Sequence, residues 1–365
     1  MSIGKRVLIT GATGAIGSWH VLELLKRGYD IICLIRGGDG VGCFNRLAAI
    51  IGKDIALKVK IINGDITKPL ASLDEQMINE LKGKIDIIIH HAGSIKFDRK
   101  WQNEIMATNI GGTTNMLTLA EVLGVRYFCY DSTAYALNTE PRNPYEESKQ
   151  IAEAIVLDWR YGKSMVWRPS IVVGRLSDGV THGFNGYYGF FSGFLKLKEQ
   201  LAKKWASDPG QCQEQGFEFN GNGSLVLQQP LYIDYSREST LNLVAVDWAV
   251  ASMTNLMEKA KWDTAYNIVD NNPPKVAWVI ERSFEILGIE GVRRLSGGIN
   301  IESVGFWHDV QTSINSQLER FWPYINYEPR FISDVLTPAP TVDLPFITTM
   351  LNYAIENKFG YERSK

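Results

Sequence analysis

A tyrosine and a lysine stand four positions apart in the segment 143–149, which reads NPYEESK. Asn143 is a typical helix N-cap and Pro144 suits the first helical position, so we expect a helix that presents Tyr145 and Lys149 on one face. An unperturbed tyrosine hydroxyl has a pKa of about 10 and is a poor acid–base catalyst at neutral pH. A neighbouring ammonium favours the phenolate, so we expect Lys149 to lower the pKa of Tyr145 and enable proton transfer.

Further polar side chains are expected near this pair. An apolar strand at 126–131 ends at Ser132 and Thr133, and a hydroxyl at this carboxyl end would face a reacting carbonyl group. We favour Thr133 over Ser132 as the second hydrogen-bond donor. Asn109 falls inside a long predicted helix near the same site, where it would orient Lys149 through a backbone kink or a water; the alternative is a buried asparagine that is satisfied by ordinary contacts.

A glycine-rich turn stands near the start of the chain, where residues 10–17 read TGATGAIG between an apolar run and a helical pattern. A strand, such a turn and a helix together are typical of a dinucleotide-binding loop. Gly11 permits the tight turn, Gly14 lets the backbone approach a pyrophosphate at the helix N-terminus, and Gly17 lets the helix pack closely. The residues expected to hold the cofactor here are Gly11, Thr13, Gly14, Ala15, Ile16 and Gly17.

The end of the second predicted strand indicates which dinucleotide is bound. A site selective for NAD usually has Asp or Glu there, to accept a hydrogen bond from the ribose 2′-hydroxyl. This chain reads CLIRGG over residues 33–38, with no carboxylate. Arg36 can pair with a 2′-phosphate, and Arg46 is a second nearby cation, so we predict NADPH rather than NADH. The alternative for Arg36 is an ordinary solvated surface charge.

Two further strand ends supply predicted cofactor contacts. Asp65, followed by Ile66, would lie by the adenine, where its oxygen could accept from the exocyclic amine. Residues 90–93 read HHAG and end the fourth strand, which would place His91, Ala92 and Gly93 by the nicotinamide-side ribose. We predict no metal site at the paired histidines, because no Cys, Asp or Glu stands nearby at ligand spacing.

The elements that must position these residues alternate regularly over the first 175 residues. Apolar runs at 6–10, 29–35, 59–63, 85–90, 126–131 and 164–173 are predicted strands, and helical patterns fill 16–27, 47–55, 74–81, 101–123 and 144–160. Strand–helix–strand repeats require parallel strands, and runs this apolar suit a sheet buried on both faces. We therefore predict an α/β fold, a Rossmann-type doubly wound parallel sheet with ligands at the carboxyl ends of its strands.

The pattern changes after residue 175, which indicates a smaller, partly discontinuous C-terminal substrate domain. We expect a cofactor-binding domain over residues 1–180, with 225–255 rejoining it, and a substrate domain over 181–224 and 256–365. The aromatic segment 183–194 suggests either an apolar acyl pocket or ordinary core packing. The lysines of the following helix would meet an acidic carrier protein or CoA phosphates, or form a solvated basic face, which we favour.

Composition excludes several classes of protein. The chain of 365 residues has 38 basic and 40 acidic side chains, which supply no general field for nucleic acid or an anionic membrane. No apolar stretch is long enough for a membrane span, and we see no leader peptide. The cysteines form no CxxC pair, which favours a reducing, cytoplasmic location over a disulfide framework. The cysteines are Cys33, Cys43, Cys129 and Cys212. A monomer and a homodimer are both compatible with the sequence.

The motifs together resemble the extended short-chain dehydrogenase/reductase superfamily. In order along the chain stand TGATGAIG, GDIT, HHAG, NIGGT, STAY, YEESK and RPSIVVG. Within it the chain is most similar to the thioester-reductase or fatty-acyl-reductase ("male sterility") branch, through LIRG at 34–37, GDITKP at 64–69, WRPS at 167–170 and LNLVAVD at 241–247. The resemblance implies that Thr133, Tyr145 and Lys149 form a catalytic triad, that Arg36 and Arg46 select NADPH, and that the dinucleotide also contacts Pro169 and Ser170.

The resemblance favours an NADPH-dependent reductase that converts an acyl thioester, on CoA or a carrier protein, to an aldehyde or alcohol. One departure is that Thr133 and Tyr145 are only twelve positions apart, whereas the branch has a longer insertion bordering the substrate. The shorter loop favours a second reading, a ketone or aldehyde reductase of a biosynthetic pathway. A sugar-nucleotide epimerase or dehydratase is a third, against which Arg36 argues; a non-catalytic NADPH-binding sensor is a fourth, against which the Tyr145–Lys149 pair argues.

Overall fold

The computed structural model describes residues 5–295 and 305–361. The chain forms two compact units: unit 1 comprises Met1–Val172, Val244–Asn271 and Phe331–Pro340, and unit 2 comprises Val173–Leu243, Asn272–Arg330 and Thr341–Lys365. The chain thus returns to unit 1 at Val244 rather than at 225, because the strand that begins at Leu225 pairs inside unit 2.

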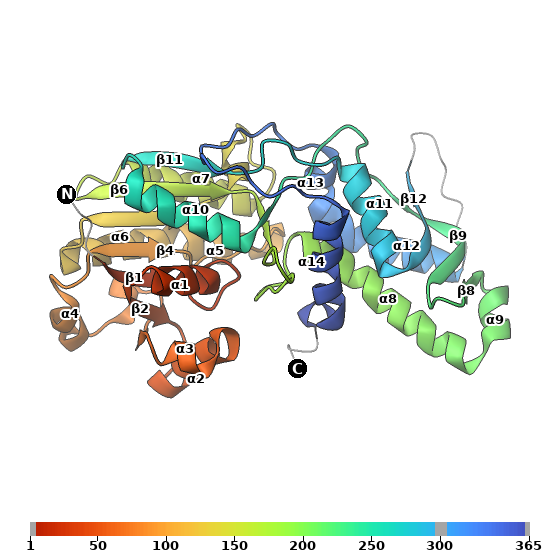
Figure 1. Cartoon of the computed structure of the whole chain (residues 1–365), viewed down its shortest axis with the longest axis horizontal. Coiled ribbons are helices and arrows are strands. Elements are labelled where there is room, and N and C mark those ends of the chain that lie inside the picture. Colours follow the sequence, from red (N-terminus) through yellow and green to blue (C-terminus); the bar gives the residue numbers. More distant parts are fainter. Residues whose placement is uncertain (1–4, 296–304, 362–365) are drawn as a thin grey trace. The chain divides into compact units, whose positions relative to one another are not determined.

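Unit 1 is built on a seven-stranded sheet in the order β11-β6-β5-β4-β1-β2-β3, and every neighbouring pair is parallel (Figure 1). The predicted doubly wound parallel sheet is therefore confirmed. The strand order reverses between β1 and β4, so the carboxyl ends of these two strands flank the crevice where such sheets bind ligands. The strands are β1 (Arg6–Thr10), β2 (Asp30–Ile35), β3 (Lys60–Asn63), β4 (Ile87–His90), β5 (Tyr127–Asp131), β6 (Lys163–Pro169) and β11 (Thr264–Ile268).

Helices cover both faces of this sheet. Figure 1 shows α1 and α10 together on its near face, and α6 and α7 pack on the other. The helix expected at 47–55 already begins at Gly40, because the Asp39 carboxylate caps it by accepting from the Gly42 amide. The helices of unit 1 are α1 (Gly17–Lys26), α2 (Gly40–Ile51), α3 (Lys53–Ala56), α4 (Glu75–Leu81), α5 (Gln102–Met106), α6 (Gly112–Leu123), α7 (Pro144–Leu157) and α10 (Val246–Lys259).

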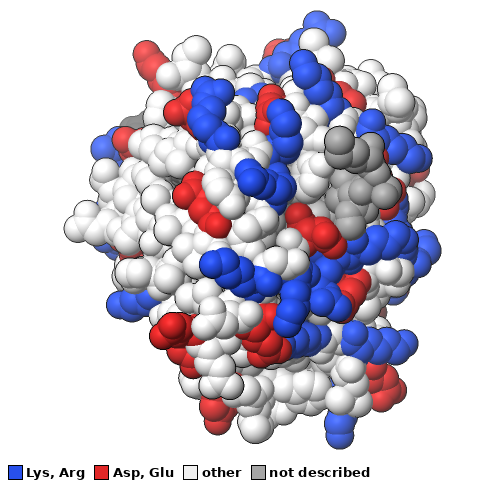
Figure 2. All heavy atoms as spheres, turned by 90° about the vertical axis from the view of Figure 1, so that its left-hand side faces the viewer, with Lys and Arg blue, Asp and Glu red and all other residues white. Residues whose placement is uncertain are grey.

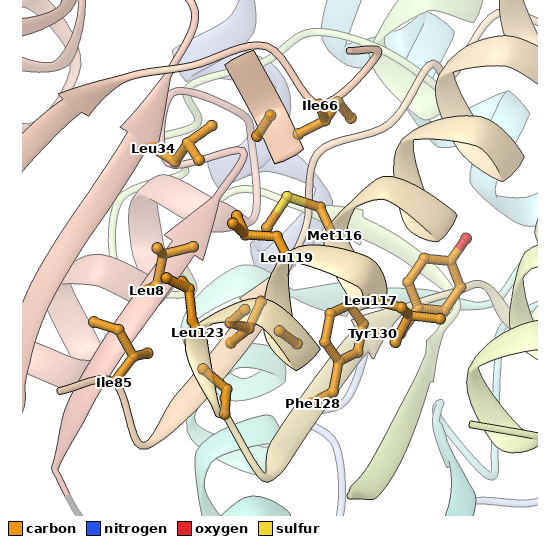
Figure 3. Close-up of a cluster of buried hydrophobic side chains, with 14 of the residues drawn as sticks. Leu8, Leu34, Ile66, Ile85, Met116, Leu117, Leu119, Leu123, Phe128 and Tyr130 are labelled. Atoms are coloured by element: carbon orange, nitrogen blue, oxygen red, sulfur yellow. The ribbon is translucent and has the colours of Figure 1, made fainter. Parts of the chain in front are cut away.

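A buried apolar cluster fills the space between the sheet and α6 (Figure 3). Leu8 and Ile88 contribute from β1 and β4, and Leu119 and Leu123 contribute from α6; all four side chains are fully buried. Strands covered on both faces need apolar residues in both directions, which is why these segments read as continuous apolar runs in the sequence.

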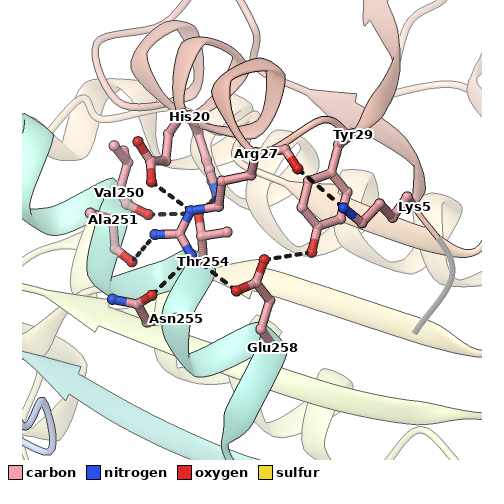
Figure 4. A network of polar contacts seen from close by, with 10 residues as sticks. Lys5, His20, Arg27, Tyr29, Val250, Ala251, Thr254, Asn255 and Glu258 are labelled. Atoms are coloured by element: carbon pink, nitrogen blue, oxygen red, sulfur yellow. Dashed lines mark hydrogen bonds and ion pairs between the residues drawn. The ribbon is translucent and has the colours of Figure 1, made fainter. Parts of the chain in front are cut away.

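A polar network joins α1 to α10, two helices more than 200 residues apart in sequence (Figure 4). Arg27 bonds to Glu23 on its own helix at 2.6 Å, and to Asn255 and Glu258 on α10 at 2.9 and 3.0 Å. Tyr29 donates to the same Glu258 at 3.0 Å. These contacts fix the segment that rejoins unit 1 against the helix that follows the glycine-rich turn.

Unit 2 has its own sheet and core. β9 (Leu225–Ile233) pairs in parallel with β12 (Ile289–Arg294) and antiparallel with β8 (Phe217–Phe219). A short two-stranded sheet of β7 (Ile171–Val173) and β10 (Leu243–Ala245) lies where the chain passes between the units. The helices of unit 2 are α8 (Tyr187–Ser207), α9 (Pro209–Glu214), α11 (Val276–Leu287), α12 (Phe306–Leu318), α13 (Trp322–Asn326) and α14 (Leu344–Glu356).

The aromatic segment at the start of α8 is buried in unit 2. Phe191 and Phe194 meet the ring of Phe284 on α11 edge to face, at centroid distances of 5.5 and 4.8 Å. Phe190 packs in the same way against Phe321. The structure favours the core-packing alternative for these rings.

Charges of both signs lie interspersed on the face of the molecule that Figure 2 shows. Of the α8 lysines, Lys198 donates to the Leu287 carbonyl at 2.8 Å, so this cation serves an internal contact. None of the helices in residues 5–295 and 305–361 is long and apolar enough to cross a membrane.

Candidate functional site

The helix that carries Tyr145 and Lys149 begins as expected. Asn143 accepts a hydrogen bond from the Glu146 amide at 3.0 Å, and Pro144 occupies the first turn of α7. Glu146 is fully buried and pairs with Arg142 at 2.6 Å, which fixes the preceding loop onto the helix. The N-terminal turn of α7 is therefore a rigid support for Tyr145.

The side chain of Thr133 lies close enough to Tyr145 to lower the pKa of the tyrosine hydroxyl. Ser132 instead donates to Glu153 at 2.8 Å, and Glu153 is bound by Arg168. The structure therefore brings Thr133, and not Ser132, to the tyrosine hydroxyl.

Lys149 is buried on the next turn of α7, where its Nζ donates to the backbone carbonyl of Asp131 at 2.6 Å. Nζ also lies 4.8 Å from the centre of the Tyr130 ring. A Cβ added to Gly93 would lie 3.0 Å from Asn109 Oδ1 and 3.5 Å from this Nζ, so the segment after β4 passes close to both side chains. The carboxyl ends of β4 and β5 and the first turns of α7 thus converge on Lys149.

The electrostatics of Tyr145 differ from the sequence expectation. Burial raises the pKa of Tyr145, the charge of Asp131 raises it further, and only the contribution of Thr133 lowers it. Burial also lowers the pKa of Lys149, which weakens the ammonium as a partner for the phenolate. Burial and the charges of Asp131 and Glu146 outweigh the contribution of Thr133, so the pKa of Tyr145 lies above its ordinary value, and the expected lowering by Lys149 is not met in this arrangement.

Asn109 lies in a π-helical turn, η3 (Ala107–Gly111), which interrupts the long helix expected over residues 101–123. Its side chain accepts from the Ser94 amide at 2.7 Å and donates to the Ser94 carbonyl at 3.0 Å and the Ser148 hydroxyl at 2.8 Å. From this π-helical turn, Asn109 fixes the segment after β4 onto α7.

The glycine-rich turn is held by close backbone contacts. Gly11 has φ +72°, and a Cβ there would lie 2.6 Å from the Ala92 amide nitrogen, so β1 and β4 approach closely at this point. A Cβ at Gly17 would lie 2.3 Å from the Gly11 carbonyl oxygen. Gly17 thus permits the helix to close on the turn itself rather than on the sheet. Thr13, Gly14, Ala15 and Ile16 form the exposed or half-exposed part of the turn before α1.

Arg36 and Arg46 are both exposed, one after β2 and the other on α2. The loop that carries Arg36 is fixed by Asn63 at the end of β3: its side chain accepts from the Gly37 amide and donates to the Gly38 carbonyl, both at 3.2 Å. The sequence analysis missed Asn63, because its partners come from another strand end.

Asp65 makes local contacts after β3. Its Oδ1 accepts from the Thr67 amide at 3.0 Å and the Thr67 hydroxyl at 2.8 Å. Burial raises the pKa of the Asp65 carboxyl, but the Thr67 hydrogen bonds and the charges of Arg36 and Lys68 outweigh burial and leave this pKa below its usual value. The carbonyl of the neighbouring Ile66 accepts from Asn115 at 2.8 Å.

The side chain of His91 is buried, and its ring nitrogens lie 2.9 Å from Asp131 and 2.8 Å from His20. The amide of Ala92 donates to the Thr10 hydroxyl at 3.2 Å, and Gly93 is exposed. Pro169 ends β6, and the Ser170 hydroxyl is buried without a hydrogen-bond partner in the described part of the chain. Sequence reasoning missed Asp131 and His20 altogether.

No set of three or more His, Cys, Asp or Glu side chains in the described ranges is arranged to hold a metal ion. His90, the residue before His91, bonds through Nδ1 to the Thr10 hydroxyl at 2.7 Å. Burial, with smaller contributions from the charges of Lys149 and His91, lowers the pKa of His90 to about 3.

Comparisons with known proteins show which family the sequence matches. The family model described as male sterility protein matches residues 9–143 and 136–253. A nonribosomal peptide synthetase of Aspergillus flavus, asaC, is 29% identical over 172 residues, which are 45% of this chain and 16% of that protein. The fatty acyl-CoA reductase wat of Drosophila melanogaster is 28% identical over 146 residues, 36% of this chain and 28% of that one. The chain thus spans a small part of these relatives.

Among solved structures, the terminal R domain from the myxalamid PKS-NRPS biosynthetic pathway is similar in fold. Its TM-score is 0.73 at 21% identity, and the alignment covers 98% of this chain and 92% of that one.

We predict that Gly17→Ala weakens binding of NADPH and of NADH about tenfold or more, because its Cβ cannot lie 2.3 Å from the Gly11 carbonyl oxygen without displacing the turn. Fluorescence titration of each reduced dinucleotide measures the Kd values. Gly40→Ala is the matched control, since nothing lies within 4 Å of its added Cβ. Equal Kd values for the two variants would contradict a dinucleotide on this turn.

A second prediction concerns acid stability. His90 has a pKa of about 3 in the folded chain, against an ordinary value of 6.5, so between these values the unfolded chain binds a proton that the folded chain does not. Stability is therefore lost as the pH falls from 6.5 towards about 3, by roughly 1.4 kcal/mol per pH unit for this one group.

Urea denaturation at several pH values measures how steeply the free energy of unfolding changes with pH. This slope should be smaller in His90→Asn. His308→Asn should leave it unchanged, because His308 is 61% exposed. An unaltered slope in His90→Asn would show that His90 is not the group responsible.

Proposed function

The chain belongs to the male sterility protein family. We propose that it is an NADPH-dependent reductase that converts an acyl thioester to an aldehyde. A second reduction would convert the aldehyde to the alcohol. The observation that carries the proposal is the placement of Thr133 beside Tyr145, whose pKa it lowers, next to the buried Lys149 at the carboxyl ends of β4 and β5. Two hydroxyls held together in this way can stabilise the oxygen of a carbonyl group as it gains charge.

The residues near β1 fit a dinucleotide. In the turn over residues 10–17, Gly11 and Gly17 leave no room for a Cβ, and the turn precedes the N-terminus of α1, which favours an anion. The cofactor would be held by this turn, by Asp65 and Ile66, and by residues 91–93. Pro169 and Ser170 at the end of β6 would also contact it. When bound, the reduced cofactor supplies the hydride.

The chain's own groups supply the rest of the proposed reaction. As the hydride bonds to the carbonyl carbon, the electron pair of the C=O bond moves to oxygen, which Thr133 and Tyr145 stabilise and Tyr145 protonates. The carbon–sulfur bond then breaks, the hydroxyl proton passes to the leaving sulfur, and the products are an aldehyde and a thiol. Lys149 holds the Asp131 carbonyl and keeps the end of β5 aligned with α7.

The substrate class is an acyl thioester on CoA or on a carrier protein. Support comes from the fold similarity to a terminal R domain and to a thiolation-reductase di-domain of an archaeal non-ribosomal peptide synthetase. The second candidate, a ketone or aldehyde reductase, is favoured by the twelve-position separation of Thr133 and Tyr145, which leaves a short loop beside the substrate. NADPH oxidation with a panel of acyl-CoAs, carrier thioesters, aldehydes and β-ketoesters separates the two.

We predict that Tyr145→Phe lowers kcat at least about a hundredfold, because the general acid is removed, while the Kd of the dinucleotide changes little. The measurement is NADPH oxidation with the best substrate of the panel, together with fluorescence titration. Tyr127→Phe is the control, since this tyrosine is on β5 and packs against Trp262. Full turnover by Tyr145→Phe would contradict the mechanism. If the unmodified chain turned over no substrate of the panel, the non-catalytic NADPH-binding sensor would be favoured.

A further prediction concerns cofactor choice. Arg36→Ala should reduce the ratio of kcat/KM for NADPH to that for NADH about tenfold or more, because an exposed guanidinium that pairs with the 2′-phosphate is lost. Arg160→Ala serves as the control, because this arginine is 84% exposed and pairs locally with Asp158. A ratio that stays the same in Arg36→Ala, or a native preference for NADH, would refute the assignment of NADPH.

A further inference from the structure

Phe97 packs its ring against the ring of Tyr145. The two ring centroids lie 5.6 Å apart and the ring planes are inclined at 63°, which is an edge-to-face arrangement. Phe97 follows β4, whereas Thr133 follows the neighbouring strand β5, so two adjacent strand ends each bring one side chain to Tyr145. Thr133 acts on the hydroxyl of Tyr145, and Phe97 acts on its ring.

The segment that carries Phe97 is also joined to the backbone of Tyr145. Asn109 binds the Ser94 amide at 2.7 Å and the Ser94 carbonyl at 3.0 Å, and it donates to the Ser148 hydroxyl at 2.8 Å. Ser148 in turn donates to the Tyr145 carbonyl at 2.8 Å. The segment after β4 therefore meets the first turn of α7 twice, through polar contacts at Ser94 and through a ring contact at Phe97.

Contacts within the segment set the place of Phe97 on either side of it. The Nζ of Lys96 donates to both carboxylate oxygens of Glu104 at 2.8 Å and lies 3.9 Å from the centre of the Trp101 ring. The Trp101 amide donates to the Asp98 carbonyl at 3.0 Å, in the short helical turn η2 (Arg99–Trp101).

Ordinary core packing does not account for the direction of the Phe97 ring. Phe97 is half-buried and lies outside the apolar cluster between the sheet and α6. The other large apolar side chains of its segment stay at the surface, since Ile95 is 47% and Trp101 is 41% exposed. Phe97 is the member of this exposed segment whose ring lies on Tyr145.

The position of the Tyr145 hydroxyl depends on more than its backbone. The cap at Asn143 fixes the backbone of α7, but the side chain can still turn about its Cα–Cβ bond, and Tyr145 is only half-buried. Such a turn swings the hydroxyl away from Thr133. A general acid must lie within about 2.6–3.2 Å of the oxygen it protonates, and a misplacement of about 1 Å can lower the rate about a hundredfold.

We propose that Phe97 is a positioning residue, whose ring holds Tyr145 in the rotamer that keeps its hydroxyl beside Thr133 and which acts on the reaction through that hydroxyl. The second half of this inference rests on the proposed function. The first half concerns the rotamer of one side chain, which is measured without substrate or cofactor.

Nuclear magnetic resonance of the full chain with labelled tyrosine tests the hold on Tyr145, whose signals are identified by their loss in Tyr145→Phe. The three-bond couplings across the Cα–Cβ bond report the rotamer. We expect one rotamer of Tyr145 in the native chain and averaged couplings in Phe97→Ala. Trp101→Leu is the matched control, because it removes an exposed ring of the same segment, and it should leave the couplings as they are. A single, unchanged rotamer in Phe97→Ala would overturn the proposal.

The link to the reaction is tested with the substrate that the chain turns over best. Phe97→Ala should lower kcat about tenfold or more, because the hydroxyl is displaced, with little change in KM or in the Kd of the dinucleotide. Phe97→Tyr keeps a ring at this position and should retain most of the native kcat. Glu104→Gln removes the exposed ion pair with Lys96 and should have little effect, since such pairs contribute little to stability.

A double-mutant cycle separates positioning from a general structural role. If Phe97 acts through the Tyr145 hydroxyl, Phe97→Ala should cause no further loss of kcat in a chain that already carries Tyr145→Phe. The same fold loss in both backgrounds would overturn the coupling to the reaction. If the chain turned over no substrate, the proposed function would fail, whereas the couplings would still decide whether Phe97 holds Tyr145.

Discussion

The burial of the Lys149 ammonium is the constraint on which the rest of unit 1 depends. A cation removed from water must find fixed acceptors, and Lys149 finds one in the backbone carbonyl of Asp131 at 2.6 Å. That bond joins the carboxyl end of β5 to the first turns of α7. The capped start of α7 and the buried pair of Glu146 and Arg142 then hold Tyr145 against Thr133.

Neighbouring buried polar groups are satisfied in separate sets around this lysine. Glu153 forms an ion pair with Arg168 and accepts a hydrogen bond from Ser132. Thr133 is therefore the hydroxyl that lies beside Tyr145. Asn109 joins the segment after β4 to Ser148 of α7. The charges of Asp131 and Glu146 still act on Tyr145, and both raise its pKa.

Much of unit 1 follows from local patterns. The strands expected at 6–10, 85–90 and 126–131 are present to within two residues, because apolar runs bounded by polar turns have few alternatives to buried strands. The cap at Asn143 is also as expected, since capping depends on neighbours in sequence. The boundaries between the units differ from the expectation because strand pairing over long separations decides them: β9 pairs with β12, and β11 adds to the edge of β6.

The sequence by itself determined the parallel sheet, the glycine-rich turn and the helix with Tyr145 and Lys149, since each depends on residues within a few positions of one another. Only the tertiary structure decided the electrostatics of the site. The direction of the Tyr145 pKa depends on burial and on Asp131, and the contacts that run from Asp131 through His91 and His20 to Thr254 join residues 123 positions apart. A carboxylate, two histidines and a threonine carry no local pattern; they become one unit because four elements, each folded for its own reasons, bring them within hydrogen-bond distance.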